Sequence, residues 1–202
     1  MRYVNNVTLT PLIALVPFLC AIALLACSGE QAWFKGIDLT GTKEEMTFSL
    51  SDVDGKQRTL ADFRGSYLLV FFGFLQCPDV CPTTLVRAAE VRKKLGPDGA
   101  KVKLVFISVD PERDSAELLR DYLKAFDPEF VGLRGTAEQT REAAKALNVF
   151  YEKVPTGSSY TVNHTAITYI FDPKGQLRLG MRHTQEVNDY VMDLRTLMKQ
   201  QS

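Results

Sequence analysis

The sequence contains few cysteines and has no excess of charge of either sign. The 202 residues include four cysteines and two histidines, and 24 basic residues balance 24 acidic ones. Four cysteines are too few for a disulfide-dense scaffold, and a balanced charge gives no electrostatic basis for binding nucleic acid. We therefore predict no nucleic-acid partner. Hydrophobic residues make up 46% of the chain, which predicts one globular domain with an accessory segment.

A long apolar run, PLIALVPFLCAIALLA, ends at Ala26, and Arg2 is the single charged residue before it. This layout is typical of a signal peptide over residues 1–26. The letters LLAC, followed by SGE, resemble the lipobox of bacterial lipoproteins, in which the cysteine, here Cys27, becomes the lipidated first residue. An uncleaved N-terminal anchor is the alternative. Both interpretations predict an exported protein that is anchored to the membrane and faces the periplasm.

Residues 27–45 lack apolar periodicity, which predicts a tether or a loosely docked arm, so the domain is expected over residues 46–202. Alternation of polar and apolar residues around Asp54-Gly55 predicts an opening β-hairpin. The runs SYLLVFFGF and KVKLVFISVD are typical of central strands buried on both faces. Apolar spacing and capping residues predict helices over 82–95, 115–126, 136–147 and 186–198, and strands in TAITYIFD and QLRLGMR.

The order of these elements predicts an α/β domain. Strands that alternate with helices are expected to be parallel. The strands TAITYIFD and QLRLGMR form a late hairpin, which adds antiparallel strands. The central sheet is therefore expected to be mixed and flanked by helices. This is the order of a thioredoxin-like fold with an N-terminal β-hairpin extension. Cys77 and Cys81 follow the first central strand, and in such sheets the functional crevice lies beyond the carboxyl ends of the strands.

The cysteine pair lies in FGFLQCPDVCPTTL, with three residues between the thiols rather than the two of a C-x-x-C motif. Proline suits the first turn of a helix and restricts the residue before it, so we predict that the helix begins at Pro82 with Cys81 near its N-cap. The positive end of the helix favours thiolates, which are the nucleophiles and the metal ligands. The pair can form a disulfide, exchange disulfides or hold a soft cation. A purely structural disulfide is the weakest interpretation, because so short a loop constrains the unfolded chain little.

His164 is the candidate third ligand. It lies immediately before TAITYIF, a strand expected beside the cysteine-bearing one, and in thioredoxin-like oxidoreductases the corresponding loop faces the cysteines. Two thiolates and one imidazole suit copper, and Cu(I) especially. If Cys77, Cys81 and His164 share one ion, the ring nitrogen must lie within about 8 Å of both sulfurs, because metal bonds are about 2 Å long. His183 is expected to be a surface or capping residue.

Two acidic residues, Asp110 and Asp114, follow the second buried strand in ISVDPERD. We expect Asp114 to cap the next helix and Asp110 to form a turn with Pro111. A role for Asp110 in orienting the ligand set is the alternative.

Four motifs together resemble the Sco (SenC/PrrC-like) copper-delivery proteins of respiratory membranes: DGKQRTLADFRG, FGFLQCPDVCPTTL, ISVDPERD and NHTAITYIFDPKG. The likeness covers roughly Phe48 to the C-terminal helix. It implies that Cys77, Cys81 and His164 bind one copper ion, as Cu(I) or Cu(II). It also implies a metallochaperone that serves the dinuclear copper site of cytochrome c oxidase subunit II or a related copper protein, alongside other periplasmic copper chaperones.

Two residues depart from the pattern of that family. Gln76 stands where a Thr-His pair is frequent, and Asn163 stands where an aspartate commonly precedes the histidine; both are expected to tune affinity. A second function stays open, a periplasmic thiol-disulfide reductase in which Cys77 and Cys81 are the redox-active pair and act on the copper-ligand cysteines of a partner. A peroxiredoxin-type peroxidase shares the fold, but its Thr-x-x-Cys signature is absent.

Overall fold

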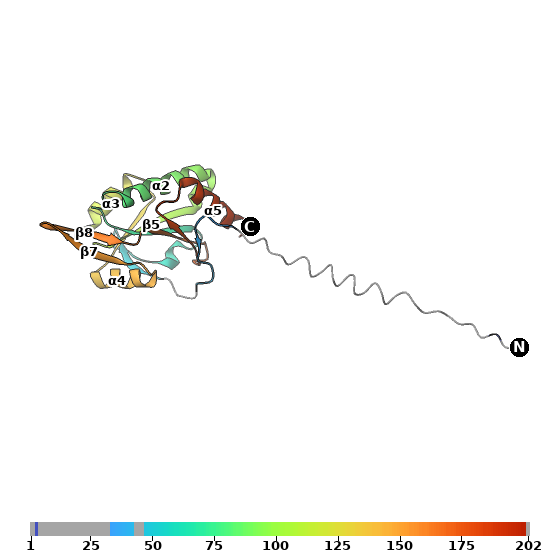
Figure 1. The fold of residues 1–202 in the computed structure, drawn as a ribbon, viewed down its shortest axis with the longest axis horizontal. Helices are drawn as coiled ribbons and strands as arrows, with labels where there is room; N and C mark the ends of the chain where they lie inside the picture. Colours follow the sequence, from blue (N-terminus) through green and yellow to red (C-terminus); the bar gives the residue numbers. More distant parts are fainter. Residues whose placement is uncertain (1–2, 4–32, 43–46, 201–202) are drawn as a thin grey trace. The chain divides into compact units, whose positions relative to one another are not determined.

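The computed structural model describes residues 3, 33–42 and 47–200 (Figure 1). The predicted signal segment, with Cys20 and Cys27, lies outside the described residues, so the expectations that concern it stay predictions. The chain divides into two units, Met1–Trp33 and Phe34–Ser202, and the second contains the domain. Within the described ranges, no helix combines the length and the apolar character needed to cross a membrane.

Three parallel strands form the centre of the main sheet. β4 (Tyr67–Gly73) and β5 (Val102–Ser108) pair along their whole length, and β6 (Val131–Arg134) pairs with the other side of β5. All residues of β4 are buried, and all but one of β5. Apolar residues can occupy every position of these strands because the sheet is covered on both faces. The two predicted central strands are confirmed, whereas β6, only four residues long, is not predicted.

Antiparallel strands flank this centre, so the sheet is mixed, as predicted. The hairpin around Asp54-Gly55 is present and joins one edge of the sheet through β6. The late hairpin is also present and pairs with β4. Within the described residues the sheet has eight strands, in the spatial order β1 (Ile37–Asp38), β10 (Leu177–Arg182), β9 (Ile167–Phe171), β4, β5, β6, β2 (Ser49–Asp52) and β3 (Gln57–Thr59).

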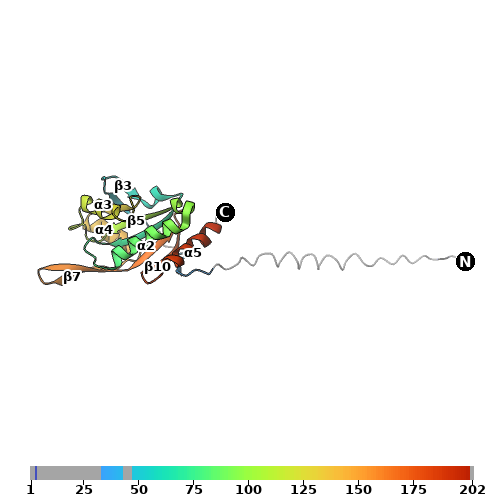
Figure 2. The same cartoon turned by 90° about the horizontal axis from the view of Figure 1, so that it is seen from above.

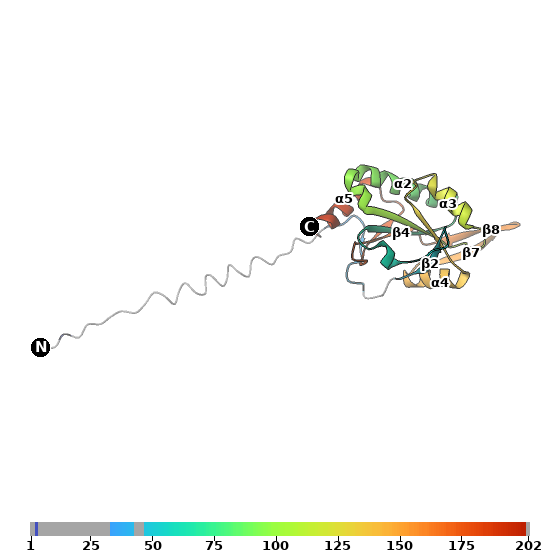
Figure 3. The same ribbon diagram turned by 180° about the vertical axis from the view of Figure 1, so that it is seen from behind.

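Helices cover both faces of the sheet, with α2, α3 and α5 on one face and α4 on the other (Figures 1 and 3). Successive side chains of a strand point to opposite faces, so β4 contributes to two cores. Phe71 packs in the core beneath α2 and α5, and Phe72 packs in the core beside α4. The helices are α2 (Val80–Leu95), α3 (Ala116–Lys124), α4 (Ala137–Ala146) and α5 (Val187–Lys199), with short 3-10 helices η2 (Leu60–Phe63) and η3 (Gly96–Lys101).

The start of α2 differs from the prediction. The helix begins at Val80 rather than at Pro82, and its N-cap is Asp79, so Cys81 lies inside the first turn. Proline is accepted there because the first N–H groups of a helix have no partner within the helix. The helix ends where expected, at Gly96, which has a φ of 62°.

A further hairpin, formed by β7 (Tyr151–Thr156) and β8 (Ser159–His164), is not predicted from the sequence. In the described part of the chain these strands pair only with each other. Figures 1 and 2 show the hairpin projecting from the body of the domain. Its turn includes Gly157, with a φ of 61°, and Pro155 within β7 weakens the strand pattern in the sequence.

Part of the segment predicted to be a tether or a docked arm contacts the domain. β1 extends the edge of the sheet by pairing with β10. The carboxylate of Asp193, in α5, accepts hydrogen bonds from the backbone N–H groups of Lys35 (2.9 Å) and Gly36 (2.8 Å). The strand β1 is not predicted from the sequence, because the edge of β10 and the carboxylate of Asp193 hold this segment rather than a stripe of apolar side chains.

Candidate metal centre

The two cysteines lie where β4 ends and the chain turns into α2. The N–H of Cys77 donates to the carbonyl of Phe74 (3.2 Å), and the N–H of Cys81 lies 3.4 Å from the sulfur of Cys77 and donates to it. An amide of the first helical turn therefore points at the Cys77 sulfur and favours negative charge there. Cys77 is half-buried, Cys81 is fully buried, and both are free thiols.

Gly73, the last residue of β4, makes room for the Cys81 side chain. A Cβ at Gly73 would lie 2.8 Å from the Cys81 sulfur and 2.8 Å from two ring atoms of Phe106, whereas carbon atoms in ordinary contact are about 3.5–4.0 Å apart. The sequence gives little indication that Gly73 lies against Cys81. Its one signal is a glycine inside an apolar strand, which is typical of a close approach to the backbone.

His164 ends β8 and reaches the cysteines from the projecting hairpin. Its ring packs edge-on against Phe71 and Phe74, with centroid separations of 5.8 and 5.9 Å. Nδ1 lies 3.2 Å from the carbonyl oxygen of Thr165. A carbonyl only accepts hydrogen bonds, so Nδ1 carries the proton and Nε2 keeps its lone pair. Nε2 lies 3.6 Å from the Cys81 sulfur, so the free lone pair belongs to the nitrogen that faces the thiols.

The three predicted ligands converge. The sulfurs of Cys77 and Cys81 and a ring nitrogen of His164 all lie within 4.8 Å of one another, well inside the limit of about 8 Å expected from the sequence. Two atoms bonded to one ion at about 2.0–2.3 Å are at most about 4.6 Å apart. The donor set therefore fits a single soft metal ion with movements of a few tenths of an ångström. That these residues bind a metal stays a prediction.

Contact between the two thiols sets their protonation. A hydrogen bond from the Cys81 thiol lowers the pKa of Cys77 to about 4 against the opposing effect of burial. The same contact, together with burial, raises the pKa of Cys81. At neutral pH the half-buried sulfur is therefore a thiolate and the buried one a thiol. Binding a metal through both requires the loss of one proton, from Cys81.

Asp114 does not cap α3 as predicted; Ser115 does, and its hydroxyl accepts from the N–H of Leu118 (3.2 Å). The buried carboxylate of Asp114 instead accepts from the hydroxyl of Ser108 (2.6 Å) and from the N–H of Leu75 (3.3 Å). Burial raises the pKa of Asp114 to about 6. Asp114 thus anchors the loop that carries the cysteines.

Asp110 is buried and forms an ion pair with Arg113, and it accepts a hydrogen bond from the hydroxyl of Tyr160 (2.8 Å). A role for Asp110 in orienting the ligands stays a prediction, and the side chains that it contacts are these two. His183 is exposed in the turn after β10, the position expected of a surface residue.

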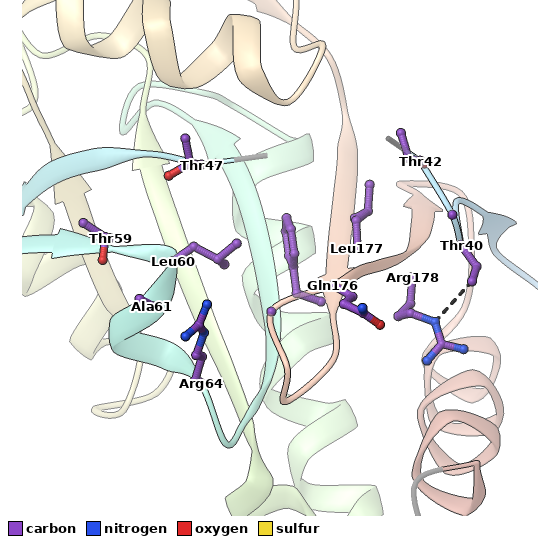
Figure 4. Close-up of a pocket in the computed structure, with 13 residues that line it drawn as sticks. Thr40, Thr42, Thr47, Thr59, Leu60, Ala61, Arg64, Gln176, Leu177 and Arg178 are labelled. Atoms are coloured by element: carbon purple, nitrogen blue, oxygen red, sulfur yellow. Dashed lines mark hydrogen bonds between the residues drawn. The ribbon is translucent and has the colours of Figure 1, made fainter. Parts of the chain in front are cut away.

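A cavity of about 690 Å³ lies apart from the three predicted ligands, between η2 and the start of β10 (Figure 4). Threonine side chains, Arg64 and Arg178 line it, and the Nε of Arg178 donates to the hydroxyl of Thr40 (3.1 Å). Neither cysteine of the pair nor His164 is among its lining residues. The predicted metal centre lies beyond the carboxyl end of β4 instead.

Comparison with known sequences identifies relatives. The family model SCO1/SenC matches residues 38–199. Protein SCO2 homolog, mitochondrial, of Mus musculus is 41% identical over 132 residues, which are 63% of this chain and 52% of that protein. Protein SCO1 homolog, mitochondrial, of Homo sapiens is 40% identical over 133 residues, which are 64% and 44% of the two chains. This chain therefore spans about half the length of these curated relatives.

Solved structures resemble the domain over most of its length. Apo Sco1 from Thermus thermophilus has a TM-score of 0.74 at 39% identity and covers 84% of this chain and 99% of its own. Arabidopsis thaliana ScoI with copper bound has a TM-score of 0.73 at 33% identity and covers 76% and 97%. Bradyrhizobium japonicum ScoI with copper bound has a TM-score of 0.68 at 38% identity and covers 75% and 97%.

These likenesses agree with the topology described above and confirm the predicted thioredoxin-like fold. The matched residues include both central strands, the cysteine pair and His164. Because the family model matches well over half of the sequence and the motifs of the site lie inside the match, the chain belongs to the SCO1/SenC family.

Proposed function

We propose that this protein is a copper metallochaperone that holds one copper ion through Cys77, Cys81 and His164 and delivers it to the dinuclear copper site of cytochrome c oxidase subunit II, or matures that site. The observation that carries the proposal is the convergence of two sulfurs and one ring nitrogen within 4.8 Å. Thiolate and imidazole donors favour Cu(I). Similar proteins of Arabidopsis thaliana and Bradyrhizobium japonicum have been solved with copper bound.

The asymmetry of the pair suits transfer of a cargo ion. Cys77 is half-buried and already ionised, so it is the ligand that an incoming thiolate of a partner can reach and replace. Cys81 is buried and takes its proton back when the ion leaves, because burial and the contact with Cys77 raise its pKa. Release is thereby coupled to reprotonation of a buried thiol, which lowers the free energy of the empty site.

The N-terminal segment supports a location for this activity. The apolar run that ends at Ala26 and the letters LLAC before SGE favour export and attachment to the membrane, through lipidated Cys27 or through an uncleaved anchor. We propose that the domain faces the periplasm, where the copper sites of respiratory oxidases are assembled.

Metal titration of the full-length, reduced, metal-free protein in detergent tests the proposal. We expect one Cu(I) per chain, with tight binding lost in Cys77→Ala and Cys81→Ala and weakened in His164→Ala. His183→Ala is the matched control, because it removes the other histidine of the chain, which is exposed and away from the thiols. Tight binding of one copper ion by either cysteine variant would overturn the proposal.

Two further measurements separate delivery from disulfide exchange. Transfer predicts that the loaded protein passes copper to the metal-free, reduced copper domain of subunit II, and that His164→Ala impairs this step. If the protein is instead a thiol-disulfide reductase, the rate at which it reduces a disulfide in that domain should be unchanged in His164→Ala. Added Cu(II) should give thiolate-to-copper charge-transfer bands that His164→Ala alters and His183→Ala does not.

A further inference from the structure

His164 ends β8, a strand that does not pair with any strand of the main sheet in the described part of the chain. In the described part of the chain β7 and β8 pair only with each other, and the hairpin projects from the body of the domain (Figures 1 and 2). The cysteines follow β4, a central strand of that sheet: Cys77 lies in the loop after it and Cys81 in the first turn of α2. A hairpin with two strands has little stability of its own, so other contacts must hold the histidine in register with the thiols.

One face of β8 carries the contacts that can do so. Alternate residues of a strand share a face, so Tyr160, Val162 and His164 point the same way. Val162 is buried in the core beside α4, together with Phe74. Tyr160 lies four residues before the histidine and is therefore a second point at which the hairpin can be fastened to the body.

Arg113 holds Tyr160 and the cysteine loop at once. Its Nη1 donates to the backbone carbonyl of Tyr160 (2.8 Å) and to the side-chain oxygen of Gln76 (2.9 Å). Gln76 immediately precedes Cys77. The two N–H bonds of a single nitrogen thus bridge the segment that carries the histidine and the segment that carries the cysteines.

The plane of the guanidinium is itself fixed. Its central carbon lies 3.7 Å from the centroid of the Tyr160 ring, and its Nε pairs with the buried carboxylate of Asp110. The Tyr160 hydroxyl donates to the same carboxylate (2.8 Å). Only a planar, forked cation can make the stack, the ion pair and the two Nη1 bonds at the same time, and lysine does not have this shape.

We propose that Arg113 is a positioning residue that holds the β7–β8 hairpin against the cysteine loop and so sets the distance of His164 from Cys77 and Cys81. The inference rests on the proposed copper site, because the distance matters for joint ligation. It assigns Gln76 a purpose as well, as the group through which the cysteine loop is joined to the hairpin.

A role limited to stability is the competing explanation. The ion pair with Asp110 would survive in Arg113→Lys, since lysine keeps the charge, whereas the planar stack and the double bridge would not. A measurement of where the histidine lies therefore distinguishes positioning from simple charge pairing. Arg120→Lys is the matched control. Arg120 also pairs with an aspartate, Asp54, and donates to a backbone carbonyl, that of Val53, but it contacts neither the β7–β8 hairpin nor the cysteine loop.

The test uses the full-length, reduced protein and begins without metal. In wild type and Arg120→Lys we expect nuclear Overhauser contacts between the rings of His164 and Phe74, whose centroids are 5.9 Å apart. In Arg113→Lys we expect these contacts to be lost. Affinity for Cu(I) should then fall about 10–100-fold in Arg113→Lys, as for other residues that orient a metal ligand, and should stay within about twofold in Arg120→Lys.

Retention of the ring contacts by folded Arg113→Lys would overturn the inference, whatever happens to the affinity. If circular dichroism shows that Arg113→Lys is unfolded, Gln76→Ala decides, because it removes the acceptor on the cysteine loop and leaves the arginine; retained ring contacts in that variant would overturn the inference equally. If wild type binds no copper, the proposed function fails, yet the comparison of metal-free spectra still tests Arg113.

Discussion

Replacement of Gly73 by alanine should damage the metal centre more than the fold. The added Cβ would lie 2.8 Å from the Cys81 sulfur and from two ring atoms of Phe106, about 0.7–1.2 Å closer than ordinary contact. Overpacking of this kind costs about 1–3 kcal/mol of the free energy of unfolding. For a domain of this size that corresponds to a fall in Tm of about 2–12 °C.

The effect on metal binding follows from the same displacement. Relief of the clash moves the Cys81 sulfur by several tenths of an ångström or more, whereas metal sites hold their bond lengths within about 0.2 Å. We expect the Cu(I) affinity of Gly73→Ala to fall about tenfold or more. The hydrogen bond from Cys81 to Cys77 should weaken as well, so the pKa of Cys77 should rise from about 4.

Gly132→Ala provides the matched control. Its Cβ would lie 2.7 Å from Leu119 and 2.9 Å from Leu123, so it overpacks the domain to the same degree, but on β6 and without touching a predicted ligand. Thermal unfolding and competitive Cu(I) titration of both variants form the assay. We expect similar losses of Tm and a loss of affinity in Gly73→Ala alone. Unchanged affinity in folded Gly73→Ala would refute the reasoning that this glycine positions Cys81.

Two further predictions concern the thiols and the N-terminal arm. The pKa of Cys77 is lowered to about 4. The rate at which iodoacetamide alkylates Cys77 should therefore be nearly independent of pH from about 6 to 8, and it should fall to half near pH 4. In Cys81→Ala the same rate should rise about tenfold per pH unit from about pH 6 to 8. A similar rise in wild type would contradict the thiolate assignment. Asp193→Ala removes the acceptor of two backbone N–H groups, at Lys35 and Gly36, so we expect a loss of about 1–3 kcal/mol of stability and faster amide exchange over residues 35–40. Unchanged exchange there would show that Asp193 does not hold β1.

Local pattern alone was enough to predict most of the core. The runs that became β4 and β5 are apolar at nearly every position, and such runs fit only a strand covered on both faces. Thr136 caps α4, because its hydroxyl accepts from the amide of Gln139, three residues away. These features depend on neighbours in sequence, so they are legible without a structure.

Other elements escaped prediction because their partners are distant in sequence. β1 is held by a strand edge and by Asp193, more than 150 residues away, and its own residues carry no apolar period. The β7–β8 hairpin contains a proline and faces water along much of its length, so its pattern resembles a loop. The first turn of α2 also starts before Pro82, because a cap by Asp79 is decided by backbone geometry.

The candidate ligands could therefore be predicted from the linear order of residues, since cysteine and histidine are rare in this chain and Cys77, Cys81 and His164 adjoin two strands that are expected to be neighbours. Their arrangement was decided by the tertiary structure alone. Only the folded chain shows that Gly73 admits the buried sulfur, that the two thiols divide one proton unequally, and that Arg113 bridges hairpin and loop. Each of these depends on how side chains from different elements pack against one another, to within a few tenths of an ångström, which no local pattern encodes.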